Sequence, residues 1–186
     1  MTKELHFYQQ KRFWISPEDL SPYLPHLAHF INVRTLVLSG FTTSVFSAES
    51  LVCCFGSFLP NVQHLQLYRP VSRPASLIKT ISHFAGVVDV EIRHPRWSIV
   101  EADDEIPAHF SPGSLQFTGT LHLQGFSEVW ARVFQLLSAQ PLKCKKVWLV
   151  ECKFNNYLPT QSLLDAASAS VRTLYLIGLG SRELLL

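Results

Sequence analysis

Charged residues are scarce in this chain of 186 residues, since Asp, Glu, Lys and Arg make up only 16% of it. An average soluble protein holds roughly 25%. The hydrophobic share is 47%, which is enough for a sizeable core. From this length we expect one domain over residues 1–186. The shortage of charge indicates an apolar surface that neighbouring structure normally covers, or a piece of a larger protein.

Basic clusters, cysteine pairs and long apolar runs are missing as well. The densest basic run is Lys143, Lys145 and Lys146 and the net charge is +2, so no nucleic-acid partner is expected. The four cysteines form no C-x-x-C pair, and no secretory signal opens the chain. We therefore expect reduced thiols and a cytoplasmic or nuclear location. The longest apolar stretch, residues 45–59, is too short and too polar to span a membrane.

Motifs of catalysis and metal binding are also absent. No G-x-S-x-G elbow occurs, and residues 178–180 are too short for a phosphate loop. His26 and His29 stand three apart, and residues 101–105 hold four acids, but neither group has the further ligands that a zinc or calcium site requires. We expect that the protein is not an enzyme and has neither a metal site nor a cofactor. A hydrolase is the third of three functional hypotheses, after the two that close this subsection.

The chain does contain a repeated extended segment. In residues 33–41, Leu36 and Leu38 point to one side of a strand, while Thr35 and Val37 point to the other. Similar segments recur at intervals of 25–31 residues, and the first core position of each is aliphatic: Leu5, Leu36, Leu65, Val90, Leu121, Val147 and Leu174. A period in this range is typical of solenoid repeats, so about seven strand units are expected.

Helical patterns lie between several of these segments. Apolar residues at helical spacing predict helices over residues 75–84, from 127 onward and from 160 to about 169, and residues 42–58 can form another. Gly86 stands where the end of a helix favours a residue that tolerates positive φ. Residues 96–114 are predicted to form a loop, and residues 115–124 the strand after it.

Polar residues such as Gln66 and Glu91 lie opposite the core residues of these strands. A doubly wound sheet is covered on both faces, and its strands are apolar on both sides. The alternation therefore predicts an α/β solenoid, with parallel strands on the concave face and helices or loops on the convex face. One face of the sheet is expected to be open to water or to a partner.

The L-x-x-L-x-L pattern of these strands resembles the leucine-rich repeat. In particular, Ile31–Gly40 and Phe58–Leu67 resemble the degenerate repeats of fungal F-box-type proteins. That resemblance implies the substrate-recognition part of a ubiquitin ligase adaptor, although no F-box motif is found in this sequence. The repeat consensus places Asn or Cys three positions after the second core leucine, and only Cys152 fits it here. Irregular turns are therefore expected.

The uncovered strand face is the predicted partner-binding site. Its candidate residues are His6, Gln66, Tyr68, Glu91, Arg93, His122, Gln124, Trp148 and Tyr175. Trp148 and Tyr175 are expected to be neighbours. Either they form an aromatic patch that binds the partner, or they only cover each other or pack on a further repeat. In a solenoid such residues line up into one strip, and interface hot spots are enriched in Trp, Tyr and Arg.

Two functions follow from this pattern. The first is a non-catalytic module that binds a protein through the concave strand face. The alternative is a truncated or degenerate repeat fragment without independent activity, because the sequence opens inside a repeat and closes on an apolar tail without capping repeats. Self-association through these uncapped ends is a further expectation.

Overall fold

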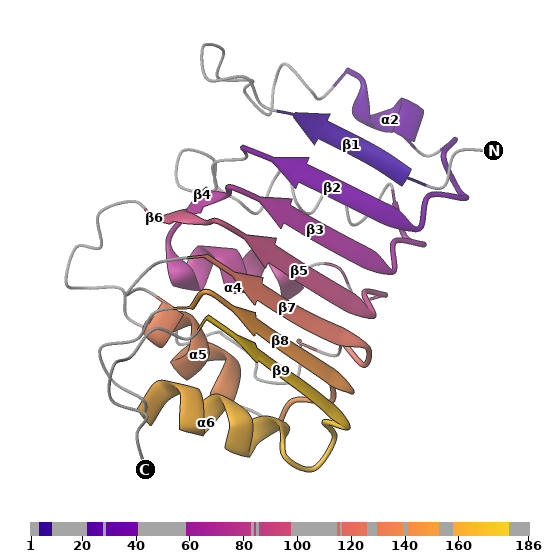
Figure 1. Ribbon diagram of the computed structural model, residues 1–186. Helices are drawn as coiled ribbons and strands as arrows, with labels where there is room; N and C mark the ends of the chain where they lie inside the picture. The colour runs from indigo at the N-terminus through magenta and orange to yellow at the C-terminus, as the bar shows by residue number, and fades with distance from the viewer. Residues whose placement is uncertain are drawn as a thin grey trace.

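Seven parallel strands form a single sheet in the computed structural model (Figure 1). The structure describes residues 4–8, 22–27, 29–40, 59–82, 84, 86–97, 115, 117–125, 130–139, 141–152 and 158–178. Each strand lies beside the preceding strand of the sheet, in the order β1 (Glu4–Tyr8), β2 (Thr35–Ser39), β3 (His64–Tyr68), β5 (Asp89–Arg93), β7 (Thr120–Gln124), β8 (Lys146–Val150) and β9 (Thr173–Ile177). The predicted α/β class with parallel strands is confirmed.

Three helices lie on one face of this sheet (Figure 1). They are α4 (Pro74–Ser82), α5 (Trp130–Ser138) and α6 (Leu158–Ala167). Within the described ranges no helix lies over the opposite face. Smaller elements complete the chain, namely the helix α2 (Leu24–Leu27) and the parallel pair β4 (Val71–Ser72) and β6 (Arg96–Trp97). None of the described helices is long and apolar enough to cross a membrane.

The helices form where the apolar spacing predicts them. Pro74 begins α4, and a proline suits that first position because its fixed φ is already helical. In α5, Trp130, Val133 and Phe134 are completely buried against the sheet. The indole N–H of Trp130 donates to the carbonyl of Gly125 at 2.8 Å, which satisfies the polar end of a buried ring. These helices therefore supply one wall of the core.

The other wall is built by two rows of strand residues. Parallel pairing aligns the strands residue by residue, so that Leu5 pairs with Leu36 at one edge and Val147 with Leu174 at the other. The predicted first core positions all fall on this one row. From β2 to β8 they are at most 1% exposed. Burying such a side chain contributes roughly 1.5–3 kcal/mol, so each repeat adds to stability by the same means.

The residue that follows each strand from β2 to β9 of the seven-stranded sheet has a positive φ angle. Six such residues have φ angles between 49° and 129°: Gly40, Arg69, His94, Gly125, Glu151 and Gly178. From Gly40 to Glu151, each of their N–H groups donates to the last residue of the neighbouring strand at 2.7–3.0 Å. This geometry turns the chain out of the sheet while it completes the ladder of hydrogen bonds. The expectation of irregular turns is therefore wrong at these positions.

Four further expectations need correction or lie outside the described residues. β7 begins at Thr120 rather than at residue 115, because Gly119 turns the chain and donates to Val88. Gly86 does not have a positive φ; instead, a Cβ there would lie 3.4 Å from the carbonyl oxygens of Pro60 and Val62. The helix predicted over residues 42–58 falls outside the described ranges, as does most of the predicted loop.

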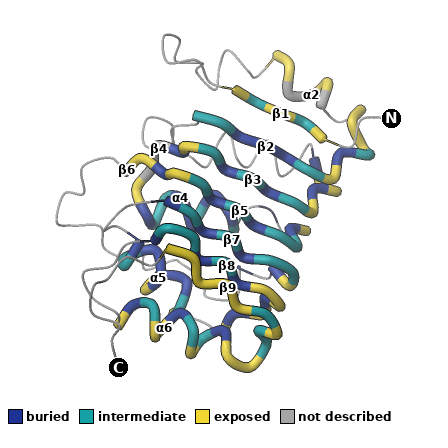
Figure 2. The backbone as a smooth tube through the Cα atoms, viewed as in Figure 1, coloured by how far each residue is buried: buried dark blue, intermediate teal, exposed yellow. Residues whose placement is uncertain are grey.

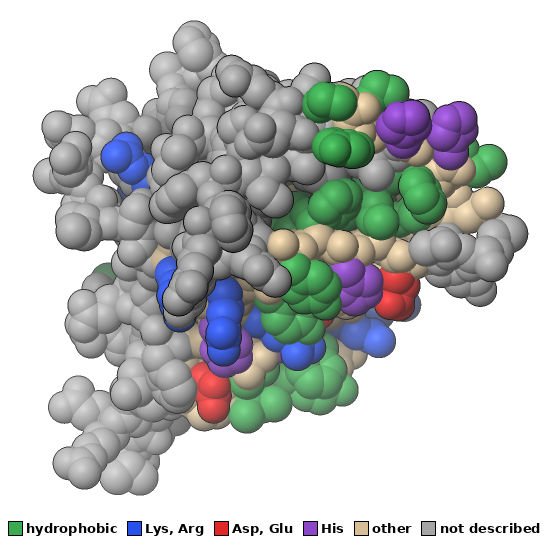
Figure 3. All heavy atoms as spheres, turned by 90° about the horizontal axis from the view of Figure 1, so that it is seen from above, with side chains coloured by type: hydrophobic (Ala, Val, Ile, Leu, Met, Phe, Trp, Pro, Cys, Tyr) green, Lys and Arg blue, Asp and Glu red, His purple; other side chains and the backbone are tan. Residues whose placement is uncertain are grey.

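The two ends of the sheet expose apolar side chains. At the β1 end, the exposed fractions of Tyr8, Tyr23 and Ile31 are 65%, 67% and 60%, and histidines lie beside hydrophobic residues there (Figure 3). At the other end, β9 is exposed along most of its length, whereas β3, β5 and β7 alternate between buried and half-buried residues (Figure 2). The core is thus deepest in the middle of the array.

Candidate functional site

All nine predicted partner-binding residues lie on the sheet face opposite the helices, which we call the uncovered face. The pairing register places one central row along it: His6, Val37, Gln66, Glu91, His122, Trp148 and Tyr175. Tyr68, Arg93 and Gln124 lie in the next row on the same face. Val37 is the most buried of these, at 5% exposed. The predicted arrangement in rows is confirmed, whereas the binding role stays a prediction.

An aromatic stack occupies the β9 end of the central row. The rings of Trp148 and Tyr175 have centroids 4.0 Å apart and planes at 30°. His122 approaches Trp148 from the other side, with centroids 5.7 Å apart. Tyr175 stays 40% exposed, so the stack covers its own inner surfaces and still presents an aromatic edge to solvent.

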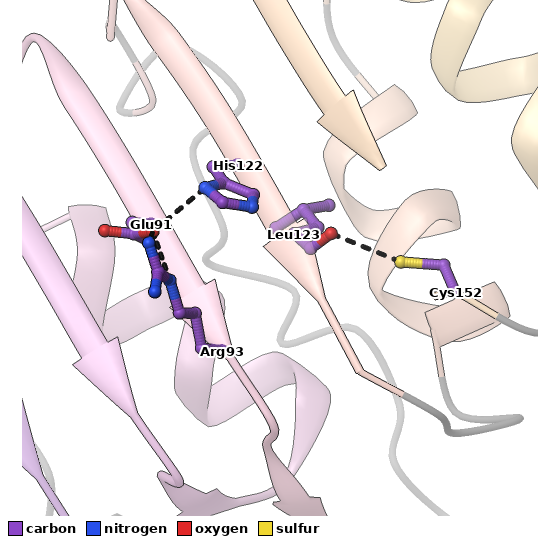
Figure 4. Close-up of polar contacts among 5 residues, drawn as sticks. All are labelled: Glu91, Arg93, His122, Leu123 and Cys152. Atoms are coloured by element: carbon purple, nitrogen blue, oxygen red, sulfur yellow. Dashed lines mark hydrogen bonds and ion pairs between the residues drawn. The ribbon is translucent and has the colours of Figure 1, made fainter. Parts of the chain in front are cut away.

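A charged cluster occupies the middle of the face. Arg93 donates to Oε1 of Glu91, and Nδ1 of His122 lies 2.9 Å from the same oxygen (Figure 4). The Glu91 side chain is 14% exposed. Burial alone would raise the pKa of Glu91, but the hydrogen bonds from His122 and Arg93, together with their attraction for the carboxylate, lower it below its ordinary value. The carboxylate is therefore held in its ionised form.

Arg93 links this cluster to a further ring. Its guanidinium carbon lies 5.2 Å from the centroid of the Tyr68 ring, within the range of a cation–π interaction. The contacts thus run without a break from Tyr68 on β3 through Arg93, Glu91 and His122 to the stacked rings on β8 and β9. The Arg93–Glu91 contact lies within β5, and the other contacts of the series join neighbouring strands.

The site residues predicted from the sequence did not include a second carboxylate on the same face, Asp89, or its neighbour His64. His64 Nδ1 lies 2.6 Å from Oδ2 of Asp89, and the backbone N–H of Thr120 donates to Oδ1 at 2.5 Å. Gly119 makes room for this contact, because a Cβ there would lie 2.2 Å from Asp89 Oδ1. The sequence pattern does place both residues on this face, since His64 and Asp89 each alternate with core residues at the start of their strands.

These side chains surround a pocket of about 240 Å³ on the uncovered face. Its walls come from five neighbouring strands, and four of these supply carboxylates, imidazoles and an amide: Glu4, His64, Gln66, Asp89, Glu91 and His122. Nε2 of His122 is buried and has no hydrogen-bond partner among the described residues. The pocket lies beside the aromatic stack, because His122 lines it and also contacts Trp148.

The cysteines of the described ranges, Cys144 and Cys152, are buried and free. Burial raises the pKa of the Cys144 thiol to about 11 and that of Cys152 to about 12, so neither is a ready nucleophile. Sγ of Cys152 lies 3.4 Å from the carbonyl oxygen of Leu123 on the neighbouring strand (Figure 4). Cys152 thus ties two successive repeats together.

The histidine pair and the acidic run remain outside this site. The rings of His26 and His29 have centroids 6.5 Å apart near α2. In the ranges that the structure describes, no group of three His, Cys, Asp or Glu side chains could hold a metal ion. Residues 101–105 fall outside those ranges.

Comparison with protein-family models, curated proteins and solved structures finds no match for this chain. Its function is therefore argued from its own residues.

Proposed function

We propose that this protein is a non-catalytic interaction module, which binds a protein partner through the uncovered face of its parallel sheet. The observation that supports this most is the continuous series of contacts from Tyr68 to Tyr175 across five strands. It combines the rings of Tyr68, Trp148 and Tyr175 with the charged pair of Arg93 and Glu91. Trp, Tyr and Arg are the residues that most often dominate binding energy at protein interfaces.

The contacts within this series also lower the cost of binding. Immobilising a flexible side chain at an interface costs about 0.5–1.5 kcal/mol. Here Arg93 is already held between Tyr68 and Glu91, and Trp148 is held between His122 and Tyr175. A partner would meet a surface whose conformation is largely set before contact.

We further propose that the fold is a leucine-rich-repeat-like solenoid. Three features support this: the strands follow one another in sequence order, they share one register, and a residue with positive φ follows each strand from β2 to β9 of the seven-stranded sheet. The resemblance to fungal F-box-type proteins then suggests a role in recognising the substrate of a ubiquitin ligase, inside the cytoplasm or the nucleus. Binding to ligase scaffold components, measured by co-purification, tests that role.

The test of the module begins with affinity capture from native cell extract and continues with the purified partner. Titration calorimetry then compares the unmodified chain with Trp148→Ala. We expect the variant to lose about ten-fold or more in affinity, since truncating a central aromatic anchor commonly costs 2 kcal/mol or more. Leu158→Ala is the matched control, because that apolar residue is 56% exposed on α6, on the helical side. Equal affinity of all three chains would exclude the uncovered face.

A second candidate, a repeat fragment without independent activity, is favoured by one observation. Four consecutive residues of β9, from Leu174 to Ile177, are 40–48% exposed. Such an edge suits association with further repeats or with another copy. Under this alternative the purified chain self-associates, and no captured partner depends on Trp148.

A further inference from the structure

We propose that the pocket beside Asp89 and Glu91 receives an arginine side chain of the protein partner. This inference rests on the proposed function, and it adds the chemistry of the partner to it. The partner segment is extended, and it carries an apolar residue close to that arginine for the stack of Trp148 and Tyr175. Charge, free acceptor atoms and spacing each support this assignment.

The pocket has an excess of negative charge. The carboxylates of Glu4, Asp89 and Glu91 line it, and among the described residues no Lys or Arg does. Arg93 offsets the charge of Glu91, with which it pairs. With histidines counted as neutral, the charges of Glu4 and Asp89 remain without a basic counterpart at the pocket wall. A cationic group therefore complements this part of the face.

Both central carboxylates keep free acceptor capacity. The contacts from Arg93 and His122 all fall on Oε1 of Glu91, and the second oxygen points away from His122 (Figure 4). Asp89 accepts from Thr120 through Oδ1 and contacts His64 through Oδ2. An ionised carboxylate has about four lone-pair positions, so each still has room for an incoming N–H. The Asp89 side chain is 31% exposed, which keeps it within reach of a ligand.

The spacing of the two carboxylates favours arginine over lysine. Asp89 and Glu91 stand two apart on β5, which places their side chains on one face at a separation of roughly 7 Å. A guanidinium is planar and carries five N–H donors in a fixed fork, so it can bridge two carboxylates. An ammonium is a compact point charge and cannot span them in the same way.

The aromatic stack lies at a matching distance. Glu91 and Trp148 occupy the same row on β5 and β8, with β7 between them, so about 10 Å separates them across the sheet. An extended segment in the polyproline II conformation advances about 3.1 Å per residue and has three residues per turn, so residues three apart point to the same side. A segment with an apolar residue three positions from its arginine therefore reaches both sites when it crosses the strands.

The first arm of the test uses synthetic peptides of sequence Gly-Ser-X-Gly-Ser-Leu-Gly-Ser, in which X is arginine, lysine or citrulline. Citrulline keeps the shape of arginine without its charge. Amide chemical shifts of Asp89, Glu91 and Thr120, followed by NMR during titration, report binding at the pocket. We expect the arginine peptide to bind about five- to ten-fold more tightly than either of the others. An arginine peptide that shifts none of these amides, or that binds no better than the citrulline peptide, would overturn the proposal.

The second arm uses Asp89→Asn, which removes the charge and keeps the Oδ1 acceptor for Thr120. It should weaken the arginine peptide about five-fold or more and leave the citrulline peptide unchanged. Asp165→Asn, the same change on an exposed carboxyl of α6, should alter neither. Equal effects of the two variants would refute a role for the pocket.

The two proposals can fail separately. If Trp148→Ala weakens binding of a purified partner and Asp89→Asn does not, the result supports the interaction module and contradicts the arginine pocket. If Asp89→Asn weakens binding of the arginine peptide and Trp148→Ala weakens binding of no partner, the result supports the pocket and contradicts the proposed function.

Discussion

The indole ring of Trp148 stacks on the phenol ring of Tyr175, with centroids 4.0 Å apart and an angle of 30° between the planes. The two residues pair directly in the register of β8 and β9. Parallel strands lie about 4.8 Å apart, so neighbouring rings in one row meet whenever both are aromatic. The stack is therefore a direct consequence of the repeat period, and it can be tested without any partner.

A double-mutant cycle measures this contact. Trp148→Ala, Tyr175→Ala and the double variant are compared in urea unfolding at neutral pH. We expect a coupling energy of about 0.5–1.5 kcal/mol, the usual value for an aromatic pair beyond its buried area. The pair Trp148 and Tyr68 serves as a control, because the two lie in different rows on strands that are not neighbours. Additive effects of the two substitutions at Trp148 and Tyr175 would show that the stack contributes nothing to folding.

Glu91 makes the stability of the folded protein depend on pH in the acidic range. Burial opposes its ionisation, but hydrogen bonds from His122 and Arg93 outweigh burial and lower the pKa of Glu91. A carboxyl whose pKa is lower in the folded state stabilises the protein above its unfolded-state value, which is about 4.5 here. That contribution is lost as the pH falls below 4.5 and through the lower folded-state pKa.

Glu91→Gln tests this dependence. The unfolding free energy of the variant, measured by urea titration between neutral and strongly acidic pH, should fall less steeply below pH 4.5 than that of the unmodified chain. Asp165→Asn removes an exposed carboxyl on the helical side and is the matched control. Identical pH profiles for the unmodified chain and Glu91→Gln would contradict the prediction.

Gly125 is required by the turn after β7. Its φ is 129°, and a Cβ would lie 3.0 Å from Cα and 3.2 Å from the backbone nitrogen of His94. Gly125→Ala should therefore lower the unfolding free energy by about 1–3 kcal/mol. Gly86→Ala is the control, because a Cβ there meets its nearest atoms at 3.4 Å and φ is not positive. A similar cost for both substitutions would rule out strain in the turn as the cause.

The row positions could be predicted from the sequence, whereas these turns could not. Side chains alternate with a period of two, and in-register parallel pairing carries each position into the same row of the next strand. Leu65 and Val90 thus mark the core row, and Gln66 and Glu91 the opposite face, from local pattern alone. The contacts that hold the site depend on more than pattern.

Positive φ at Arg69 and His94 illustrates the difference. Both are ordinary residues that avoid this region, at a cost of about 1–2 kcal/mol. They adopt it because each N–H completes a hydrogen bond to the neighbouring strand. The Asp89 contact with Thr120 likewise joins residues 31 apart in the sequence and requires the absence of a side chain at Gly119. Local propensity carries no information about such partners.

Burial protects the cysteines of the described core. The pKa of the Cys144 thiol is raised to about 11 and that of Cys152 to about 12, so almost no thiolate forms near neutral pH. We expect iodoacetamide to leave both unmodified in the folded protein and to label both after unfolding. Peptide mass spectrometry resolves each site, and labelling in urea is the positive control. Rapid modification of Cys152 without denaturant would mean that the β8 repeat opens readily.

The exposed strand β9 should drive self-association. The core-row residues Leu174 and Leu176 are 41% and 48% exposed, whereas their counterparts Val147 and Leu149 on β8 are fully buried. β9 is the last strand of the sheet in the described ranges, and it contains no charged residue that would oppose pairing. Unprotected edges of this kind pair with other chains, and natural proteins often block them with lysine.

Ile177→Lys should therefore reduce the association constant about ten-fold or more, because a charge at the edge must be desolvated when another strand pairs with it. Sedimentation velocity over a wide range of protein concentration measures that constant. Leu158→Lys places the same charge on an equally exposed apolar residue of α6 and controls for a general gain in solubility. If both variants dissociate alike, association does not occur through the edge of β9. If the unmodified chain stays monomeric at every concentration, β9 does not join copies of the chain. The second candidate, a repeat fragment without independent activity, then loses its support.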